Sequence, residues 1–384
     1  LIDIPMDVQK SVIDFEYPEK CEIRSYKPTT KGNYVQVRRV MAALEEAEKP
    51  LICIGGGVFA AHAENEIREL ADLMQIPVIT TMMGISVFPD DDQLFCGMIG
   101  THGVKMANAA VNECDVLFLV GARVGDRAVK TPLALEKTTK IIHIDIDPAE
   151  IGKNIGADLP LVGDAKLVLQ QMTELAKPMK HDEWIAHIKT LGGERKYVEP
   201  AKGTVNPRVF IDRLAKKMPA NVTVVADVGQ NQIWTCTEYK FRKEGRLLTS
   251  GGMGTMGYSV PAAIGAKMAD NSRATVAICG DGAFQMSFME LATAVQFGVD
   301  IKVVVMTNNR LGMVRELQTN GYHDRQTAVF LDGSPDFIKL AEAYGIPAMR
   351  VYDDDTMEKG VEMLAEHKGI CLVEVVVDKD MPTL

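Results

Sequence analysis

The sequence lacks three features that would each indicate a different class of protein. No two of its seven cysteines form a CxxC pair and most lie in apolar runs, so we expect reduced core residues and a cytoplasmic protein. No apolar run approaches the ~18 residues that a membrane-spanning helix needs. Basic residues are outnumbered, 42 Lys and Arg against 52 Asp and Glu, and the formal net charge of −10 disfavours nucleic acid or an anionic membrane as a partner.

The composition is that of a globular protein with room for more than one domain. The chain has 384 residues, of which 47% are hydrophobic and 24% charged. Apolar runs of strand length alternate with stretches of helix length in two series, the first from residue 35 and the second from residue 206. Because such alternation forms parallel sheets covered on both faces, the predicted fold class is α/β with two doubly wound parallel-sheet domains. We expect a linker over residues 1–31, one domain over 32–182 and a second over 183–384.

Periodicity and turn residues place the individual elements. Helices are predicted over residues 35–47, 64–74, 104–114, 207–217, 261–269, 287–297, 335–344 and 357–367. Strands are predicted over residues 51–54, 77–80, 116–120, 140–145, 222–227, 274–279, 301–306 and 371–377, with a short one near Met349. The stretch 161–175 is expected to close the first domain, and 178–200 to form a polar bridge.

Two polar side chains follow consecutive buried strands in the stretch from Gly280 to Arg315. Asp281 stands in a Gly-Asp-Gly turn after one strand, and Asn308 follows the next strand. Parallel strands of a βαβ unit end at the same edge of a sheet, so the two side chains should lie side by side. Mg²⁺ takes oxygen ligands and usually keeps only one or two protein side chains, with phosphate oxygens in other places. The pair therefore predicts a magnesium diphosphate site.

The same stretch resembles the thiamine diphosphate (ThDP) motif, in which GDG precedes a helix, a strand and paired asparagines. Its wording, with MELATAVQFG and LGMVRE, resembles the large subunit of the acetohydroxyacid (acetolactate) synthase family, and the resemblance covers essentially the whole chain. It implies a ThDP- and Mg²⁺-dependent transferase that condenses pyruvate with a second 2-keto acid, giving 2-acetolactate in the first common step of branched-chain amino acid biosynthesis. It also implies a homodimer or tetramer, a regulatory small subunit, a Rossmann-like middle domain that binds FAD and a last domain that binds the ThDP diphosphate.

The resemblance assigns roles to the last domain. The metal ligands would be Asp281, Asn308 and the backbone carbonyl of Arg310, and the diphosphate would meet Gly229, Gln230, Asn231, Gly282 and Ala283. Asn231 replaces a histidine of the family, which removes a possible cation and keeps a donor, so a weakened contact is expected. Gly254 would offer its backbone to the aminopyrimidine, and Met256 would hold the two cofactor rings in a V, where an unbranched side chain suits an irregular wedge.

The first domain carries a weak dinucleotide signal. Residues 55–60 fit G-x-G-x-x-A after a strand, but residues 75–83 hold no carboxylate to bind an NAD ribose, so NAD is disfavoured. The resemblance implies FAD instead, held by Arg24, Gly55, Gly56, Gly57, Thr80, His102, Gly103, Gly121, Ala122, Arg123, Asp145 and Asp164. Where the family reads GARFDDR, this chain has Val124 and Gly125, which should loosen the loop beside the flavin.

A second departure lies beyond the asparagines. The family tends to read GMVxQW, and its tryptophan helps to select 2-ketobutyrate as second substrate. Leu317 occupies that position here. We therefore expect only a weak preference for 2-ketobutyrate over pyruvate.

Residues 1–9 resemble the end of the family's first, pyrimidine-binding domain, where a final strand leads into a linker. The resemblance thus implies the last two of three domains. The family's activating glutamate lies in that first domain, and we find no substitute, since Glu290 and Glu316 belong to the diphosphate end. We expect this polypeptide to bind parts of the cofactors and to be inactive by itself.

Carbon dioxide release from pyruvate tests the expected inactivity. With ThDP, Mg²⁺ and FAD added, the chain alone should release no more carbon dioxide than the same mixture without protein, because no glutamate activates the aminopyrimidine. Turnover that depends on the chain would contradict this expectation.

Two alternatives remain open at this point. Other ThDP carboligases and decarboxylases, such as glyoxylate carboligase or oxalyl-CoA decarboxylase, share the Asp-Asn pattern. A non-catalytic nucleotide-binding module would hold FAD or ADP without any need for Asp281. ThDP binding with and without Mg²⁺ separates the second alternative from the enzymes.

Overall fold

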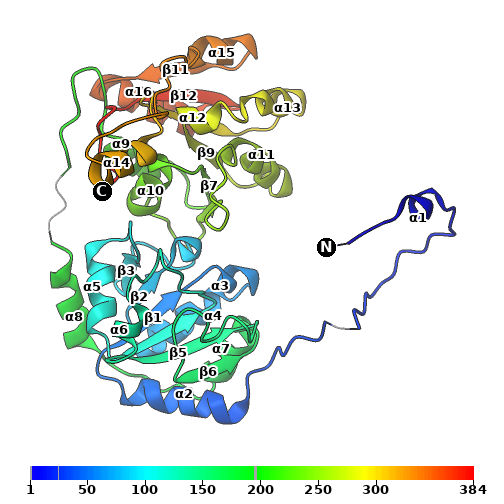
Figure 1. Cartoon of the computed structure of the whole chain (residues 1–384), viewed down its shortest axis with the longest axis vertical. Helices are drawn as coiled ribbons and strands as arrows, with labels where there is room; N and C mark the ends of the chain where they lie inside the picture. Colours follow the sequence, from blue (N-terminus) through cyan, green and yellow to red (C-terminus); the bar gives the residue numbers. More distant parts are fainter. Residues whose placement is uncertain (1, 25, 194–196) are drawn as a thin grey trace.

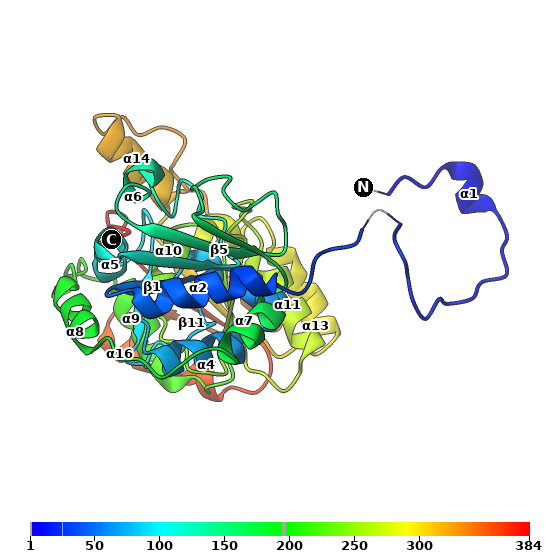
Figure 2. The same cartoon turned by 90° about the horizontal axis from the view of Figure 1, so that it is seen from below.

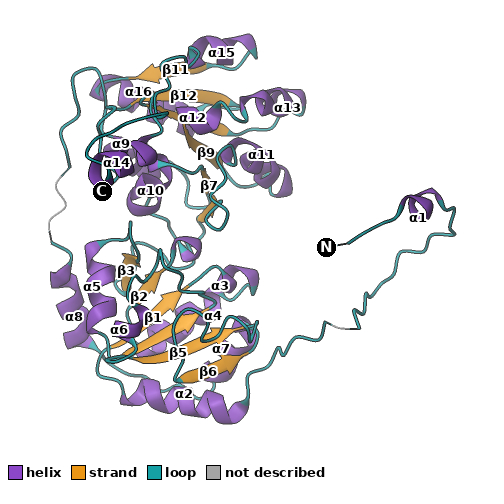
Figure 3. Ribbon diagram, in the orientation of Figure 1, coloured by secondary structure: helices purple, strands orange, loops and turns teal. Residues whose placement is uncertain are grey.

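Two six-stranded sheets, each with all strands parallel, organise the chain in a computed structural model that describes residues 2–24, 26–193 and 197–384. Helices cover both faces of each sheet (Figures 1 and 3). The predicted α/β class with two doubly wound parallel sheets is confirmed. No helix among the described residues is long and apolar enough to cross a membrane. All seven cysteines are free, with Cys21 exposed and the others buried.

The first sheet has the strand order β3-β2-β1-β4-β5-β6. Its strands are β1 (Pro50–Ile54), β2 (Val78–Thr80), β3 (Phe95–Met98), β4 (Val116–Val120), β5 (Lys140–Asp145) and β6 (Leu159–Val162). One face packs on α2 (Tyr34–Glu46), α3 (Gly57–Ala60), α4 (Glu64–Met74) and α7 (Ala165–Thr173), and the other on α5 (Lys105–Glu113), α6 (Pro132–Leu135) and α8 (Asp182–Leu191). The central strands are buried on both faces, which explains their continuous apolar runs.

The second sheet has the order β11-β12-β10-β9-β7-β8. Its strands are β7 (Thr223–Ala226), β8 (Arg246–Thr249), β9 (Thr275–Gly280), β10 (Lys302–Thr307), β11 (Ala348–Val351) and β12 (Cys371–Val376). One face packs on α9 (Pro207–Lys217), α10 (Gln230–Glu238) and α16 (Asp354–Glu366). The other packs on α11 (Ser259–Ala269), α12 (Asp281–Phe284), α13 (Leu291–Gln296) and α15 (Phe337–Ala343). The helix α14 (Gly312–Gly321) follows β10.

The structure corrects three predicted segments. Residues 287–297 do not form one helix, because the 3-10 turn η2 (Phe288–Glu290) precedes the short α13. The predicted polar bridge over 178–200 contains α8, which buries Trp184 and Ile188 against the first sheet. Each sheet forms one unit with the helices that pack on it. The boundary between the two units therefore lies after Leu191 and not at residue 182.

The N-terminal segment departs from the expected strand. Leu1 lies outside the described residues, residues 2–4 form no strand, and α1 (Met6–Lys10) follows them. Residues 2–24 are exposed throughout, and both views show this segment running away from the sheets (Figures 1 and 2). The linker expected over residues 1–31 stays a prediction.

Polar contacts join the two sheets' packing units. Arg246 in β8 reaches Glu64 at 2.7 Å and lies over the ring of Phe59 at 5.0 Å. In the loop after β2, the backbone N–H of Asp90 donates to the carbonyl of Phe241 at 2.9 Å, and the N–H of Phe241 donates back to the Asp90 carboxylate at 2.9 Å. Reciprocal bonds of this kind fix the separation of the two segments.

Candidate functional site

A cavity of about 130 Å³ lies at the carboxyl ends of β9 and β10, beside the starts of α10 and α14. Asp281 and Asn308 both line it, so the parallel strands bring the two side chains together as their positions predict. Met256, Gly282, Ala283 and Arg310 also border the cavity. The cavity forms where a parallel sheet usually binds its ligand.

Backbone donors hold the Asp281 carboxylate, which is only 2% exposed. Its Oδ2 accepts from the N–H groups of Asn308 at 3.1 Å and Asn309 at 2.6 Å, and its Oδ1 from that of Gly282 at 2.8 Å. Burial nevertheless raises the pKa of Asp281 to about 6, while the three hydrogen bonds oppose the shift. A carboxylate with so high a pKa is poised to gain from a cation beside it.

The Asn308 amide is held at both ends. Its Oδ1 accepts from the N–H of Arg310 at 3.0 Å, and its Nδ2 donates to Gln230 Oε1 at 3.2 Å. The chain turns sharply here, since Asn309 adopts a φ of +53°, which asparagine tolerates better than most residues. The turn brings the backbone of Arg310 back toward the cavity.

The Arg310 side chain is occupied outside the cavity. Its guanidinium pairs with Asp332 at 2.9 Å and stacks over the Phe330 ring at 4.6 Å. A short antiparallel pairing with the segment around Phe330 fixes the main chain on this side. What Arg310 offers a ligand is therefore its backbone carbonyl, the group that the resemblance named.

The donor set fits Mg²⁺ better than a softer metal. Asp281, Asn308 and the Arg310 carbonyl contribute oxygen only, as a hard cation prefers. Among the described residues, no group of three or more His, Cys, Asp or Glu side chains could hold a metal ion. Two side chains and a carbonyl leave coordination places that phosphate oxygens and water would fill, so the site suits a metal that arrives with a diphosphate.

The segment before α10 differs from what its motif predicted. Gly229 has a φ of +141°, and a Cβ there would lie 2.8 Å from Asn231 Oδ1, so glycine is required. Asn231 does not keep its donor for a ligand, because Nδ2 donates to the carbonyls of Asp227 at 2.8 Å and Ile278 at 3.2 Å. The expected weak contact between the Asn231 amide donor and a diphosphate is therefore not available in this arrangement.

Asp227, which the sequence reasoning did not single out, fixes the loop that carries Met256. It is fully buried, and it accepts from the N–H of Gly257 at 3.0 Å and from that of Ser259 at 2.7 Å. Met256 reaches into the cavity, where its Cε would lie 3.4 Å from a Cβ on Gly282. Gly254 has a φ of +66° and is exposed, outside the cavity lining. A carboxylate at the last position of the predicted strand 222–227 was the signal that could have identified Asp227.

The residues predicted to hold FAD follow the strands of the first sheet, and most gather at its carboxyl edge. A Cβ on Gly55 would lie 2.1 Å from the Gly121 carbonyl, and one on Gly57 would lie 2.7 Å from Gly121 Cα. Close packing between the two loops therefore explains these glycines without any ligand. Gly56 is less constrained, with Met83 Cβ 3.1 Å from its Cβ position.

Other predicted flavin residues are engaged locally. The Asp164 carboxylate caps α7 by accepting from Leu167 N at 3.1 Å, and Asp145 accepts from Asp147 N at 3.0 Å. Arg24 is exposed in the N-terminal segment, which the views show apart from the first sheet (Figures 1 and 2). The structure therefore does not bring Arg24 to the other flavin candidates.

Three further residues predicted to bind FAD lie at or near the carboxyl edge of the first sheet. Thr80 is fully buried and its hydroxyl has no partner among the described residues. His102 is half-buried, and burial lowers its pKa, although the negative charge of Glu316 across the domain boundary partly opposes this lowering. Gly103 allows a close turn, since its Cβ would lie 2.4 Å from the Ile99 carbonyl carbon.

The loop after β4 is strained where it was expected to be loose. Val124 has a φ of +43°, which is costly for a β-branched residue, and its side chain is buried in the core of the first sheet. Arg123 beside it is exposed. Gly125 has open space around its Cβ position, so of the two residues that depart from the family's wording only Gly125 is without close packing.

The metal-free protein should lose stability as the Asp281 carboxyl ionises. Its pKa is raised from 3.8 to about 6, so its favourable contribution is complete below pH 4 and is lost as the pH rises through 6. The melting temperature of Asp281→Asn should therefore fall less steeply than that of the wild type between pH 4 and 7. Thermal unfolding at several pH values measures both slopes.

Asp90 provides the matched control, because burial also raises its pKa to about 6 at a position between the two sheets. Adding Mg²⁺ with ThDP should reduce the part of the fall in melting temperature with pH that is due to Asp281. The part that is due to Asp90 should stay unchanged. An Asp281→Asn slope equal to that of the wild type would contradict the prediction.

Comparison with known proteins identifies both units. Residues 37–172 match the central domain of thiamine pyrophosphate enzymes, and residues 227–375 match their C-terminal domain, which binds thiamine pyrophosphate. The match of residues 227–375 contains Asp281, Asn308 and the whole cavity edge formed by β9 and β10.

Individual relatives agree with these matches. The chain is 40% identical over 391 residues to a probable acetolactate synthase large subunit of Methanocaldococcus jannaschii, covering 98% of this chain and 66% of that protein. It is 39% identical over 362 residues to an acetolactate synthase large subunit of Corynebacterium glutamicum, covering 91% and 58%. It is 39% identical over 397 residues to an acetolactate synthase of Arthrospira platensis, covering 99% and 68%. The chain thus spans about two thirds of the length of the curated relatives it matches, and it belongs to the acetolactate synthase family of thiamine pyrophosphate enzymes.

Proposed function

We propose that this chain binds Mg²⁺ and the diphosphate of ThDP for an acetolactate synthase reaction, the condensation of pyruvate with a second 2-keto acid. The observation that carries the proposal is the pairing of Asp281 with Asn308 in one cavity, inside the segment that matches a thiamine pyrophosphate-binding domain. Asp281, Asn308 and the Arg310 carbonyl would hold the metal, and the backbone at Gly282 and Ala283 would lie along the diphosphate.

The chain's own residues prepare the site for this chemistry. ThDP, when bound, supplies the electron sink for decarboxylation of a 2-keto acid. Met256 narrows the cavity beside Gly282, and Asp227 fixes the loop that carries it. The mostly apolar wall around the two metal ligands keeps the local dielectric low, which strengthens their attraction for a cation.

We also propose FAD as a ligand of the first domain. Thr80, whose buried hydroxyl has no partner among the described residues, ends β2, and Gly56 follows β1, so both lie at the edge where a dinucleotide would bind. Asp145 and Asp164 each accept a local hydrogen bond with one carboxylate oxygen. Only the other oxygen of each carboxylate would therefore be available to FAD.

A second copy of the chain is the proposed partner, as in a homodimer or tetramer. Large apolar side chains are exposed around α11 and α13, namely Met253, Met268, Met286, Met289 and Phe297. Apolar surface of this extent usually marks an interaction site. A regulatory small subunit and a cytoplasmic location belong to the same proposal, the latter supported by seven free cysteines.

Magnesium-dependent ThDP binding tests the proposal. ThDP should bind the wild type tightly only with Mg²⁺ present, and Asp281→Ala should weaken binding at least tenfold because the only charged ligand is lost. Titration calorimetry with and without Mg²⁺ measures both effects. Asp355→Ala, at an exposed carboxylate in α16, is the matched control and should bind like the wild type.

The same titration separates the competing functions. A non-catalytic nucleotide-binding module would bind FAD or ADP and show no magnesium-dependent ThDP binding, and Asp281→Ala would change nothing. Another ThDP carboligase or decarboxylase would bind ThDP as proposed but prefer glyoxylate or an acyl-CoA substrate over pyruvate.

Leu317 provides a test of substrate choice. It lies in α14 and is 62% exposed, so a larger side chain fits without repacking the core. In the active enzyme that contains this chain, Leu317→Trp should raise the use of 2-ketobutyrate over pyruvate as acceptor several-fold, because the indole adds apolar surface for the extra methyl group. A competition assay of the two products measures the ratio, and an unchanged ratio would refute this role.

A further inference from the structure

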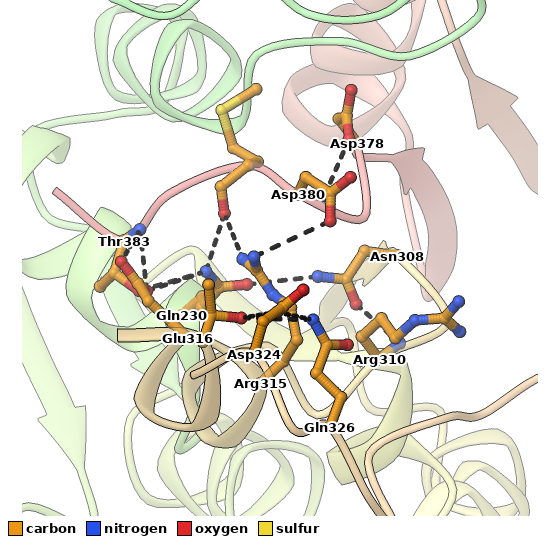
Figure 4. Close-up of polar contacts among 12 residues, drawn as sticks. Gln230, Asn308, Arg310, Arg315, Glu316, Asp324, Gln326, Asp378, Asp380 and Thr383 are labelled. Carbon is orange, nitrogen blue, oxygen red and sulfur yellow. Dashed lines mark hydrogen bonds and ion pairs between the residues drawn. The ribbon is translucent and has the colours of Figure 1, made fainter. Parts of the chain in front are cut away.

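A chain of hydrogen bonds runs from Asn308 through Gln230 to residues 381–383, as Figure 4 shows. Gln230 stands in the middle of it. Its Oε1 accepts from Asn308 Nδ2 at 3.2 Å, and its Nε2 donates to the Met381 carbonyl at 2.9 Å and to Thr383 Oγ1 at 3.1 Å. Gln230 is 4% exposed, so these partners replace water almost completely.

Residues 380–383, at the far end of this series of hydrogen bonds, are also held by contacts with α14. Glu316 in α14 accepts from the N–H of Thr383 at 3.2 Å and from its hydroxyl. Arg315 donates to the Met381 carbonyl at 3.3 Å and pairs with Asp380 at 3.8 Å. Residues 380–383 are therefore fastened to α14 on both sides of Gln230.

The Gln230 side chain packs closely against the start of α14. A Cβ on Gly312 would lie 1.9 Å from Gln230 Oε1, so the side chain lies directly against a glycine at the start of α14. Its Nε2 is directed at Met381 and Thr383, which leaves no free donor for a diphosphate. Gln230 lines the cavity, and the contact that its side chain makes there is with the predicted metal ligand Asn308.

The contact decides which atom Asn308 turns toward a cation. An amide has an oxygen that binds metal and an NH₂ group that repels it. Because Gln230 presents an oxygen, it accepts only the NH₂ group of Asn308, while the N–H of Arg310 donates to the Asn308 oxygen. Both partners are satisfied in one orientation of the amide and both are lost when it rotates by half a turn.

We propose that Gln230 is a positioning residue that orients the Asn308 amide for metal binding, and that Glu316, Thr383 and the Met381 carbonyl hold Gln230 in place. The inference rests on the proposed Mg²⁺ site. Groups that fix metal ligands from behind typically change metal affinity 10- to 100-fold.

Magnesium titration at saturating ThDP tests the proposal. Trp234 lines the cavity, so its fluorescence reports binding directly. Gln230→Met keeps the volume and removes the hydrogen bonds, and it should raise the Mg²⁺ dissociation constant about tenfold. Thr383→Val should raise it by less, since Gln230 keeps its bond to the Met381 carbonyl. Gln232→Met is the matched control, because this buried glutamine on the same helix bonds to Thr249 outside the cavity.

A second background shows whether Gln230 acts through Asn308. Asn308→Asp still offers oxygen to the metal but has no NH₂ group to orient. Gln230→Met should therefore cause no further loss of Mg²⁺ affinity in that background. An equal loss in both backgrounds, or an unchanged Mg²⁺ constant with weakened ThDP binding, would overturn the positioning role. If the wild type shows no magnesium-dependent ThDP binding, the proposed function fails first and the inference falls with it.

Discussion

The hydrogen bonds from Asn308 and Asn309 to the Asp281 carboxylate are the interaction on which the site depends. They tie the end of β9 to the end of β10 at the edge where the sheet opens, and they place a buried negative charge under the cavity. The charge is costly without a counter-ion, as the raised pKa shows. The fold thus accepts a local cost at this position that a bound cation would relieve, which is the usual relation between stability and function at such sites.

Support for this charge comes from elements far apart in the sequence. Gln230 at the start of α10 holds the Asn308 amide, Asp227 at the end of β7 holds the loop with Met256, and residues 381–383 close over Gln230. Each of these contacts uses a side chain to fix another group that faces the cavity. These contacts fix several of the groups that line the cavity where metal and diphosphate would bind.

Much of this arrangement was predictable from local pattern. The strands with continuous apolar runs, such as β4 and β10, and the meeting of Asp281 with Asn308 follow from periodicity and from the geometry of parallel strands. The missed strands β3, β6 and β8 have only four residues each, and none is buried throughout, so their sequence gives little signal. The α8 helix was missed because only Trp184 and Ile188 mark its buried side. The donors of Asn231 and Gln230 could not be assigned beforehand, because Ile278, Met381 and Thr383 reach them only through tertiary folding.

The reciprocal bonds between Asp90 and Phe241 limit which sequence changes the two halves of the molecule can accept where they meet. One of the two bonds joins main-chain atoms only. The other joins the main-chain N–H of Phe241 to the side-chain carboxylate of Asp90. Neither bond uses the Phe241 side chain, which is buried in the core of the second sheet, whereas the loop after β2 can accept little change in length. Insertions should be tolerated in exposed loops away from this seam and resisted at the seam itself.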